Sequence, residues 1–336
     1  MLSTTRVVFR GPRQASIEEV PLSKPGKGQV LIRSICSLIS TGTELTAYSG
    51  DFPPDSVWAR YVRYPWVPGY SNVGEVIACG PEVDTVHEGQ HVVSYGPHAS
   101  LVLQDASGTW PIPNGVSDEQ ASFMVLSTIA LGGVRLAQIA FGEAIVVVGA
   151  GLVGQFAMQY ARFSGGWPVI AIDLAESRLA TARTHGATHT LVGGRPESAD
   201  EIRALTKGRL ADIAIDATGN PQVIPSLFRF VRRRGRVILL GSPRGKTEVD
   251  FHDQVHTLGL QIIGAHNSVH PVHETPYNVW TQTRDGELFL DLLAAKQIIV
   301  SDLITHRYPW REAPAAYDML LSDRTQAMGV LLDWQC

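Results

Sequence analysis

The sequence predicts an α/β protein in which a doubly wound parallel sheet is flanked by β-rich segments. Three observations support this prediction. Residues 1–115 read as short strands separated by turns, strands and helices alternate from residue 117 onward, and the apolar strand 144–148 runs into the glycine-rich loop 149–154. The 336 residues are 44% hydrophobic, which is enough to build more than one domain core.

The N-terminal region predicts an irregular β barrel or sandwich. Pro-Gly and Gly-Pro pairs interrupt it at 25–26, 68–69, 80–81 and 96–97. Mostly apolar runs of strand length lie between these turns. The predicted strands are 6–9, 29–34, 74–78, 91–94 and 99–103. We place this first domain at residues 1–116.

The second predicted domain, 117–266, opens with Ser117 and, three residues later, Gln120, a pattern typical of a helix N-terminus. Helical segments such as 152–163 and 176–185 then alternate with strands apolar enough to be buried on both faces of a parallel sheet. These predicted strands are 144–148, 169–172, 212–216, 236–240 and 261–263. The basic run 232–234 is predicted to be a solvated helix end.

We place a third segment at residues 267–336, which mixes both kinds of element. Two helices are predicted, at 285–296 and 310–321. Two strands are predicted, at 303–308 and 329–334.

Bulk properties restrict the partners and the compartment. The net charge is −4, so the basic surface that nucleic acids require is missing. No uncharged apolar run reaches about 18 residues, and the N-terminus has no basic segment followed by an apolar one, so we expect neither a membrane span nor a signal peptide. Three widely separated cysteines fit a reducing cytoplasm.

An apolar strand runs directly into the pattern Gly-x-Gly-x-x-Gly. Gly149 allows a tight turn, Gly151 lets the backbone approach a pyrophosphate, and Gly154 permits close packing of helix against strand. The helix that begins at Leu152 and Val153 points its N–H groups at the phosphates. With a strand before it and an amphipathic helix after it, the pattern predicts a dinucleotide site.

Asp173, at the end of the next strand, decides between the two nicotinamide dinucleotides. A carboxylate there accepts hydrogen bonds from the adenosine ribose hydroxyls and repels a 2′-phosphate. Arg178 is the counter-evidence, because a nearby arginine can accommodate that phosphate. Since Asp173 holds the position itself, the sequence predicts NAD as the cofactor, with Arg178 beside it.

With these residues, the chain resembles the medium-chain dehydrogenase/reductase superfamily over nearly its whole length. The motifs are the glycine loop, Asp216–Gly219, Val237–Gly241 and Ile304–Tyr317. The resemblance implies a GroES-like catalytic domain and a Rossmann coenzyme domain. It also implies hydride transfer between a nicotinamide and an alcohol or carbonyl, by a homodimer or homotetramer. Further cofactor contacts are expected from Thr43, Thr128, Thr218, Gly241, Ala265 and His266.

The metal positions of the zinc enzymes in that superfamily are not kept. Their Cys-Gly-Thr/Ser-Asp motif corresponds to Thr41-Gly42-Thr43-Glu44, and their Gly-His-Glu motif corresponds to Gly69-Tyr70-Ser71. The segment expected to supply a third ligand, 123–126, has no Cys, Asp or Glu, and only Cys79 lies near the place of the structural zinc. Zinc requires Cys, His or carboxylate donors. We therefore expect neither zinc site.

Without zinc, a hydrogen-bond donor or general base has to stabilise the substrate oxygen. Tyr70 is the first candidate, although its ordinary pKa of about 10 requires lowering or a relay. Thr41 and Thr43 are candidates to bind the substrate oxygen or the nicotinamide ribose, Glu44 to act as a base, and His98 to lie in a loop near the substrate. The alternatives are structural: a packed barrel residue for Tyr70, turn hydroxyls for the threonines, and a helix N-terminal carboxylate for Glu44.

Two further groups of side chains stand out in the sequence. His266, His270 and His273 crowd the segment after the last strand of the second domain, but Pro271 argues against a helical metal site. A polar loop is the simpler interpretation of the last two. An aromatic stretch fits a substrate pocket wall, a hydrophobic lid or a subunit contact; it consists of Trp58, Tyr61, Tyr64 and Trp66.

Shorter motifs suggest a substrate class. Segments 39–44 and 67–74 resemble both the bacteriochlorophyllide a dehydrogenases and polyol or sugar dehydrogenase-like proteins, and segments 263–267 and 304–310 fit the second group better. The leading hypothesis is an NAD-dependent, zinc-independent oxidoreductase acting on a secondary alcohol or ketone of a sugar, cyclitol or polyol. The alternatives are a zinc-free quinone or enoyl reductase, a dehydrogenase of a large hydroxyethyl tetrapyrrole, and a non-catalytic NAD sensor.

Overall fold

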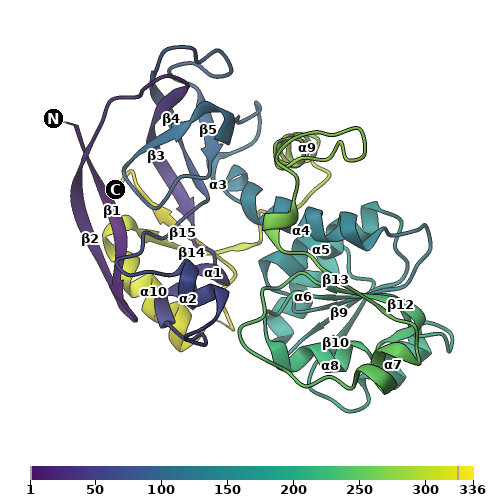
Figure 1. Cartoon of the computed structure of the whole chain (residues 1–336). Coiled ribbons are helices and arrows are strands. Elements are labelled where there is room, and N and C mark those ends of the chain that lie inside the picture. The colour runs from purple at the N-terminus through teal and green to yellow at the C-terminus, as the bar shows by residue number, and fades with distance from the viewer. Residues whose placement is uncertain (1, 324) are drawn as a thin grey trace. The chain divides into compact units, whose positions relative to one another are not determined.

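The structure, a computed structural model, describes residues 2–323 and 325–336 (Figure 1). The chain divides into two compact units. Unit 1 comprises Met1–Leu126 and Gln282–Cys336, and unit 2 comprises Ser127–Thr281. The units change over at 126 and 281, whereas the sequence placed the boundaries at 116 and 266. The segments on either side of unit 2 build one unit together.

Unit 1 is built on a seven-stranded sheet that is antiparallel except between its two C-terminal strands. The order along the sheet is β14 (Ile304–Pro309), β15 (Gly329–Asp333), β3 (Gln29–Leu38), β4 (Asn72–Cys79), β5 (His91–Ser94) and β7 (Thr109–Pro111), with β6 (Leu101–Asp105) also paired to β3. The last strand of the chain therefore pairs directly with β3, which precedes the predicted catalytic loop.

A hairpin and five helices complete unit 1. The hairpin joins β1 (Leu2–Gly11) to β2 (Gln14–Leu22). The helices are α1 (Thr43–Ser49), α2 (Val57–Tyr61), α3 (Asp118–Ala121), α9 (Gln282–Ala294) and α10 (Ala313–Ser322). Phe9, Tyr48 and Tyr317 are buried and pack ring against ring, with centroids 4.8–5.4 Å apart. This cluster ties the hairpin, α1 and α10 together.

Unit 2 contains a six-stranded parallel sheet. Its order is β10 (His189–Val192), β9 (Val169–Asp173), β8 (Ile145–Val148), β11 (Ala211–Asp216), β12 (Val231–Leu239) and β13 (Gln261–Gly264). The strand order reverses between β8 and β11, as in doubly wound dinucleotide-binding sheets. All four residues of β8 are buried, which explains the continuous apolar run in the sequence.

Two helices of unit 2, α5 (Leu152–Phe163) and α6 (Glu176–Thr184), match their predicted bounds to within one residue. The unit also contains α7 (Ser198–Leu205) and α8 (Ile224–Leu227), and α4 (Met124–Ala137) supplies most of its length to it. Ser117 and Gln120 form the predicted capping box, because each side chain bonds the other residue's backbone N–H.

The structure bears on two sequence predictions, one for the basic run 232–234 and one for membrane spans. The basic run 232–234 is not a helix end: it lies in β12, so that prediction was wrong. Within this strand, the Arg232 Nε donates to Asp212 Oδ1 at 2.6 Å. Among the described residues, one helical stretch, Asp118–Ala137, is long and apolar enough to cross a membrane, but 72% of that window is buried inside the protein, as in the core helix of a soluble protein.

Candidate active site

The turn after β8 has the shape that a dinucleotide requires. Gly149 has φ 96°, and a Cβ there would lie 2.9 Å from the carbonyl carbon of Ala217. A Cβ on Gly154 would come within 1.8 Å of the Gly149 carbonyl oxygen. Gly151 differs, because no atom lies within 4 Å of a Cβ placed on it. The first and third glycines thus permit the turn and the packing, and the second leaves the backbone open to a phosphate.

Asp173 ends β9 beside this turn and holds its backbone. Its Oδ2 accepts a hydrogen bond from the Ala150 N–H at 2.7 Å, and its Oδ1 accepts one from the Ala175 N–H at 2.8 Å. The side chain is only half-buried, so each oxygen keeps a lone pair for a ribose hydroxyl. Arg178 is half-buried in α6, and its carbonyl oxygen accepts a hydrogen bond from Gln155.

The carboxyl ends of β11 and β12 form the next part of this edge. Oδ1 of Asp216 accepts hydrogen bonds from the N–H of Thr218 at 2.9 Å and from its hydroxyl at 2.6 Å. Burial raises the pKa of the Asp216 carboxyl group. A Cβ on Gly241 would lie 2.4 Å from the Gly219 nitrogen, so only glycine allows these two turns to touch.

The remaining predicted cofactor residues fall in different places. Ala265 is buried directly after β13, and His266 is exposed beside it, with its Nδ1 accepting the Ser268 N–H at 3.2 Å. Leu152 and Val153 begin α5 next to the glycine loop. Thr128 is buried in α4, and Thr43 belongs to unit 1, where it begins α1.

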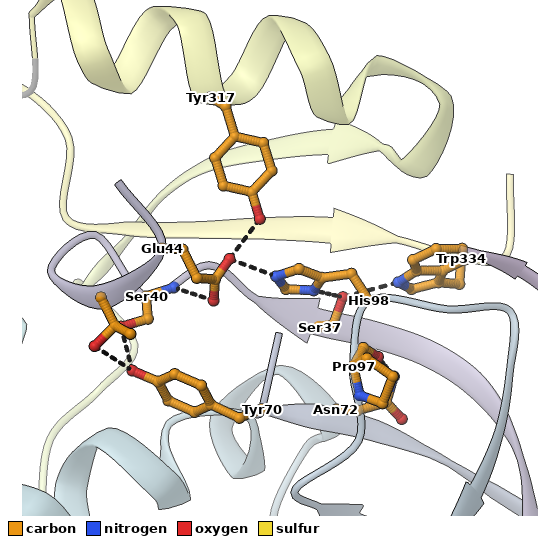
Figure 2. Close-up of polar contacts among 10 residues, drawn as sticks. Ser37, Ser40, Glu44, Tyr70, Asn72, Pro97, His98, Tyr317 and Trp334 are labelled. Carbon is orange, nitrogen blue, oxygen red and sulfur yellow. Dashed lines mark hydrogen bonds and ion pairs between the residues drawn. The ribbon is translucent and has the colours of Figure 1, made fainter. Parts of the chain in front are cut away.

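Glu44 lies in the first turn of α1 and is fully buried. Its Oε1 accepts the Ser40 N–H at 2.9 Å, and its Oε2 faces His98 Nε2 at 2.9 Å and accepts the Tyr317 hydroxyl (Figure 2). A buried carboxylate is costly unless donors surround it, and three donors from three different segments do so here. Glu44 therefore joins the β3–α1 loop to the loop before β6 and to α10.

His98, expected in a loop near the substrate, is fully buried. Its Nδ1 lies 2.7 Å from Ser37 Oγ, which already accepts the Trp334 indole N–H at 2.8 Å. The ring is therefore held at both nitrogens, by Ser37 at Nδ1 and by Glu44 at Nε2, and the residue acts by positioning Glu44.

The backbone around His98 also explains its place beside Tyr70. A Cβ on Gly69 (φ 101°) would lie 2.4 Å from the His98 nitrogen, and the His98 N–H donates to the Pro68 carbonyl at 3.0 Å. Asn72 donates to Ser34 Oγ at 2.8 Å and to the Pro97 carbonyl at 3.3 Å. The Pro-Gly pair of the sequence is therefore the point at which the Tyr70 and His98 segments meet.

Tyr70 is half-buried and donates its hydroxyl proton to Ser40 Oγ, with Thr43 Oγ1 at 3.5 Å (Figure 2). Burial, together with the nearby Glu44 charge, raises the pKa of the phenol above its ordinary value of 10. The pKa of Tyr70 is thus not lowered in this structure. The phenol therefore keeps its proton at neutral pH, and Ser40 Oγ is its hydrogen-bond acceptor.

The positions that bind zinc in the resembled enzymes do not fit a metal here. Thr41 and Tyr70 are half-buried hydroxyl residues, and Ser71 is buried. Within residues 2–323 and 325–336, no three His, Cys, Asp or Glu side chains are grouped so that they could hold a metal ion. The three histidines after β13 are therefore not grouped as metal ligands. His270 is buried, and its Nδ1 would lie 3.3 Å from a Cβ placed on Gly132.

The aromatic stretch before Pro68 belongs to the core of unit 1. Trp66 stacks near Phe9 with a centroid distance of 5.6 Å, and Tyr61 lies against both Trp58 and Trp66. Tyr64 donates to the Ala47 carbonyl at 2.5 Å. Trp58, Tyr64 and Trp66 pack against the core of unit 1, whereas Tyr61 is half-exposed at its edge, and Tyr64 is the member that bonds α1 directly.

Four residues of the network had no role in the sequence analysis: Ser37, Ser40, Tyr317 and Trp334. Tyr317 closes the motif 304–317, but the pattern gives no sign that its hydroxyl reaches Glu44, which is 273 residues away. Such pairings depend on the strand order, since β15 has to lie beside β3 before Trp334 can reach Ser37.

Comparison with known families agrees with both units. Residues 26–119 match the family described as the alcohol dehydrogenase GroES-like domain, and residues 153–280 match the family described as zinc-binding dehydrogenase. An L-threonine 3-dehydrogenase from Bacillus licheniformis is 28% identical over 345 residues, covering 92% of this chain and 93% of the relative. The D-guloside 3-dehydrogenase of Escherichia coli is 28% identical over 249 residues, covering 73% of this chain and 71% of the relative.

A solved structure shows the same fold. Galactitol-1-phosphate dehydrogenase from Escherichia coli superposes with a TM-score of 0.82 at 19% identity, covering 98% of this chain and 99% of that one. The two family matches, the full-length relatives and this likeness agree with the glycine loop and the strand order. The chain therefore belongs to the medium-chain dehydrogenase/reductase superfamily and is an enzyme of its alcohol dehydrogenase type.

Proposed function

We propose that this protein is an NAD-dependent, zinc-independent dehydrogenase of a secondary alcohol or ketone in a polyhydroxylated substrate, such as a sugar, cyclitol or polyol. The observation that carries the proposal is the Tyr70 phenol, which stands at a zinc-ligand position and is hydrogen-bonded to Ser40. The half-buried hydroxyls of Thr41 and Thr43 suit a substrate with several hydroxyl groups. The similarity to D-guloside 3-dehydrogenase supports a sugar-like substrate.

Tyr70 moves the proton in this mechanism. In carbonyl reduction the phenol gives its proton to the substrate oxygen and regains one from a hydroxyl beside it. Ser40 Oγ is its hydrogen-bond partner, and Oγ1 of the half-exposed Thr43 lies 3.5 Å from the phenol oxygen. In alcohol oxidation the hydroxyl proton moves in the opposite direction. When bound by unit 2, the nicotinamide supplies or accepts the hydride on carbon. Glu44 acts by fixing the Ser40 backbone, so that the hydroxyl stays aligned with Tyr70.

NAD is favoured over NADP because Asp173 holds the ribose position with its carboxylate. We expect Asp173→Ala to lower the NADH to NADPH affinity ratio about 30-fold, since it removes a charge-assisted hydrogen bond to the ribose and relieves repulsion of a 2′-phosphate. Fluorescence titration with both cofactors measures this ratio. The variant also loses the hydrogen bond to the Ala150 N–H, which loosens the glycine loop. That change weakens the binding of NADH and NADPH equally, so it does not alter the ratio. An unchanged ratio would contradict the assignment of NAD.

Zinc independence is tested by removing metal. Because no donor set in the described chain fits zinc, prolonged dialysis against a strong chelator should leave kcat within about twofold of its starting value. A zinc-dependent relative treated in parallel is the control, and metal content is measured on the same samples. Loss of activity that added zinc restores would overturn the proposal.

The substrate class is tested with the metal-stripped protein, NAD and a panel of sugars, cyclitols and sugar phosphates, by following NADH formation. We expect turnover with at least one polyhydroxylated secondary alcohol, and none when the same compound lacks the oxidised hydroxyl. No turnover across the panel, together with reduction of quinones or enones by NADPH, would replace this proposal with a reductase.

A further inference from the structure

Unit 2 has an open cavity of about 750 Å³ that the dehydrogenase reaction does not use. Its wall comes from α7, the turn 206–210, the turn before β12 and the single helical turn Phe251–His256. Five arginines line it: Arg203, Arg209, Arg229, Arg232 and Arg233. The only acids in the lining are Asp200 and Asp253, so its formal charge is 5 − 2 = +3.

This cavity is separate from the dinucleotide loop. It lies at the amino ends of β11 and β12, where Leu210 and Val231 line it. The glycine loop and Thr218 lie at the carboxyl ends of the parallel strands. Since β11 has six residues at about 3.3 Å each, the two ends are roughly 16 Å apart. A ligand in the cavity therefore does not compete with the cofactor.

Within the described chain, one of the five lining arginines has a carboxylate partner. Arg232 is held by Asp212 at 2.6 Å, and Arg233 donates to the Thr257 carbonyl at 2.7 Å. Arg203, Arg209 and Arg229 are exposed, and within the described chain no carboxylate lies within ion-pair distance of them; the Nε of Arg209 reaches only the Thr206 carbonyl, at 3.3 Å. They come from three different segments, α7 and two turns, that converge on one cavity.

We propose that this cavity binds a polyphosphate chain, an anion with two or three linked phosphate groups. The whole chain has a net charge of −4, so solubility does not require positive charges to be concentrated on one face. Repulsion among the arginines costs stability until an anion occupies the cavity. Guanidinium groups bind phosphate oxygens through paired N–H donors. Three such groups around one cavity suit an anion with several linked phosphates, because each phosphate offers oxygens to a guanidinium.

The probe is sodium tripolyphosphate, titrated calorimetrically into the full-length protein at about 150 mM salt, where diffuse surface attraction is screened. NADH is present in excess, so that the dinucleotide loop is filled. We expect one site per chain. The double variant Arg203→Gln/Arg229→Gln should bind about 30-fold more weakly, since each change removes a charge-assisted contact. A parallel titration with ATP distinguishes a nucleotide from a free polyphosphate. If ATP binds much more tightly than tripolyphosphate, the cavity also recognises the nucleoside. If the two bind equally, the cavity recognises the phosphate chain alone.

The matched control is Arg195→Gln/Lys207→Gln. It removes the same two charges from exposed residues that flank α7 and do not line the cavity. The control should stay within about twofold of the parent protein. Equal weakening by both double variants, or the absence of saturable binding, overturns the proposal. Unchanged far-ultraviolet circular dichroism spectra and NADH affinities establish that both variants are folded.

Discussion

Tyr70→Phe is expected to lower kcat by about 100- to 10,000-fold, the range that general acid–base groups contribute. The variant keeps the ring and removes only the hydroxyl that donates to Ser40. Steady-state rates in both directions and the free energy of unfolding measure the two effects separately. Tyr64→Phe is the matched control, because it removes a hydroxyl that only bonds the Ala47 carbonyl. A Tyr70→Phe rate within threefold of the parent enzyme would remove Tyr70 from the mechanism.

The pH profile gives an independent reading of the same group. Burial and the nearby Glu44 charge raise the Tyr70 pKa above 10, so the phenol keeps its proton through neutral pH. The kcat for carbonyl reduction should therefore stay level from about pH 7 through about pH 10, without the fall that a phenol with an ordinary pKa would produce there. A kcat that drops to half its neutral value before pH 10 would contradict the raised pKa.

Glu44→Gln is expected to lower the free energy of unfolding by about 3 kcal/mol. The carboxylate accepts from Ser40, His98 and Tyr317, and an amide in its place directs an N–H₂ group at one or two of these donors. Urea denaturation measures the loss, and kcat should fall as well because Ser40 is released.

Tyr317→Phe distinguishes the network from a general loss of packing. The single change removes one donor and should cost about 1–2 kcal/mol. In the double variant Glu44→Gln/Tyr317→Phe, the loss of unfolding free energy should be about 1 kcal/mol smaller than the sum of the two single losses, because both changes remove the same hydrogen bond. Strict additivity would show that the two residues are not coupled.

The same network makes stability sensitive to alkali. Burial and the Glu44 charge raise the Tyr317 pKa well above its ordinary value of 10. The folded state therefore holds a proton that the unfolded state releases above about pH 10. This contribution to stability is fully present below pH 10 and is lost as the pH rises through the folded pKa.

Local patterns identified unit 2 well. The strand 144–148, the glycine loop and Asp173 are contiguous, and each position has a local physical reason, such as the 1.8 Å approach at Gly154. The capping box at Ser117 is equally local. The basic run at 232–234 was misread because the pattern shows the charges but not Asp212, which holds Arg232 in a strand.

Unit 1 was harder to read because its chemistry depends on distant pairs. Glu44 and His98 were named as candidates with substrate-facing roles, yet both are fully buried and satisfy one another. The short strand β10 and the second hairpin strand β2 have weak patterns, with few buried positions, and neither was predicted. What the sequence could not supply was the register that brings residues 37, 44, 98, 317 and 334 together.

The pairing of β15 with β3 also has a consequence for the order in which the protein matures on the ribosome. All residues of unit 2 leave the ribosome before β15 exists, so the cofactor-binding half can reach its final contacts during synthesis. The first 126 residues cannot, since Ser37 and Glu44 wait for Trp334 and Tyr317. The part of unit 1 that precedes unit 2 in the chain is therefore completed after unit 2. Until then the Glu44 carboxylate lacks the Tyr317 hydroxyl as a donor.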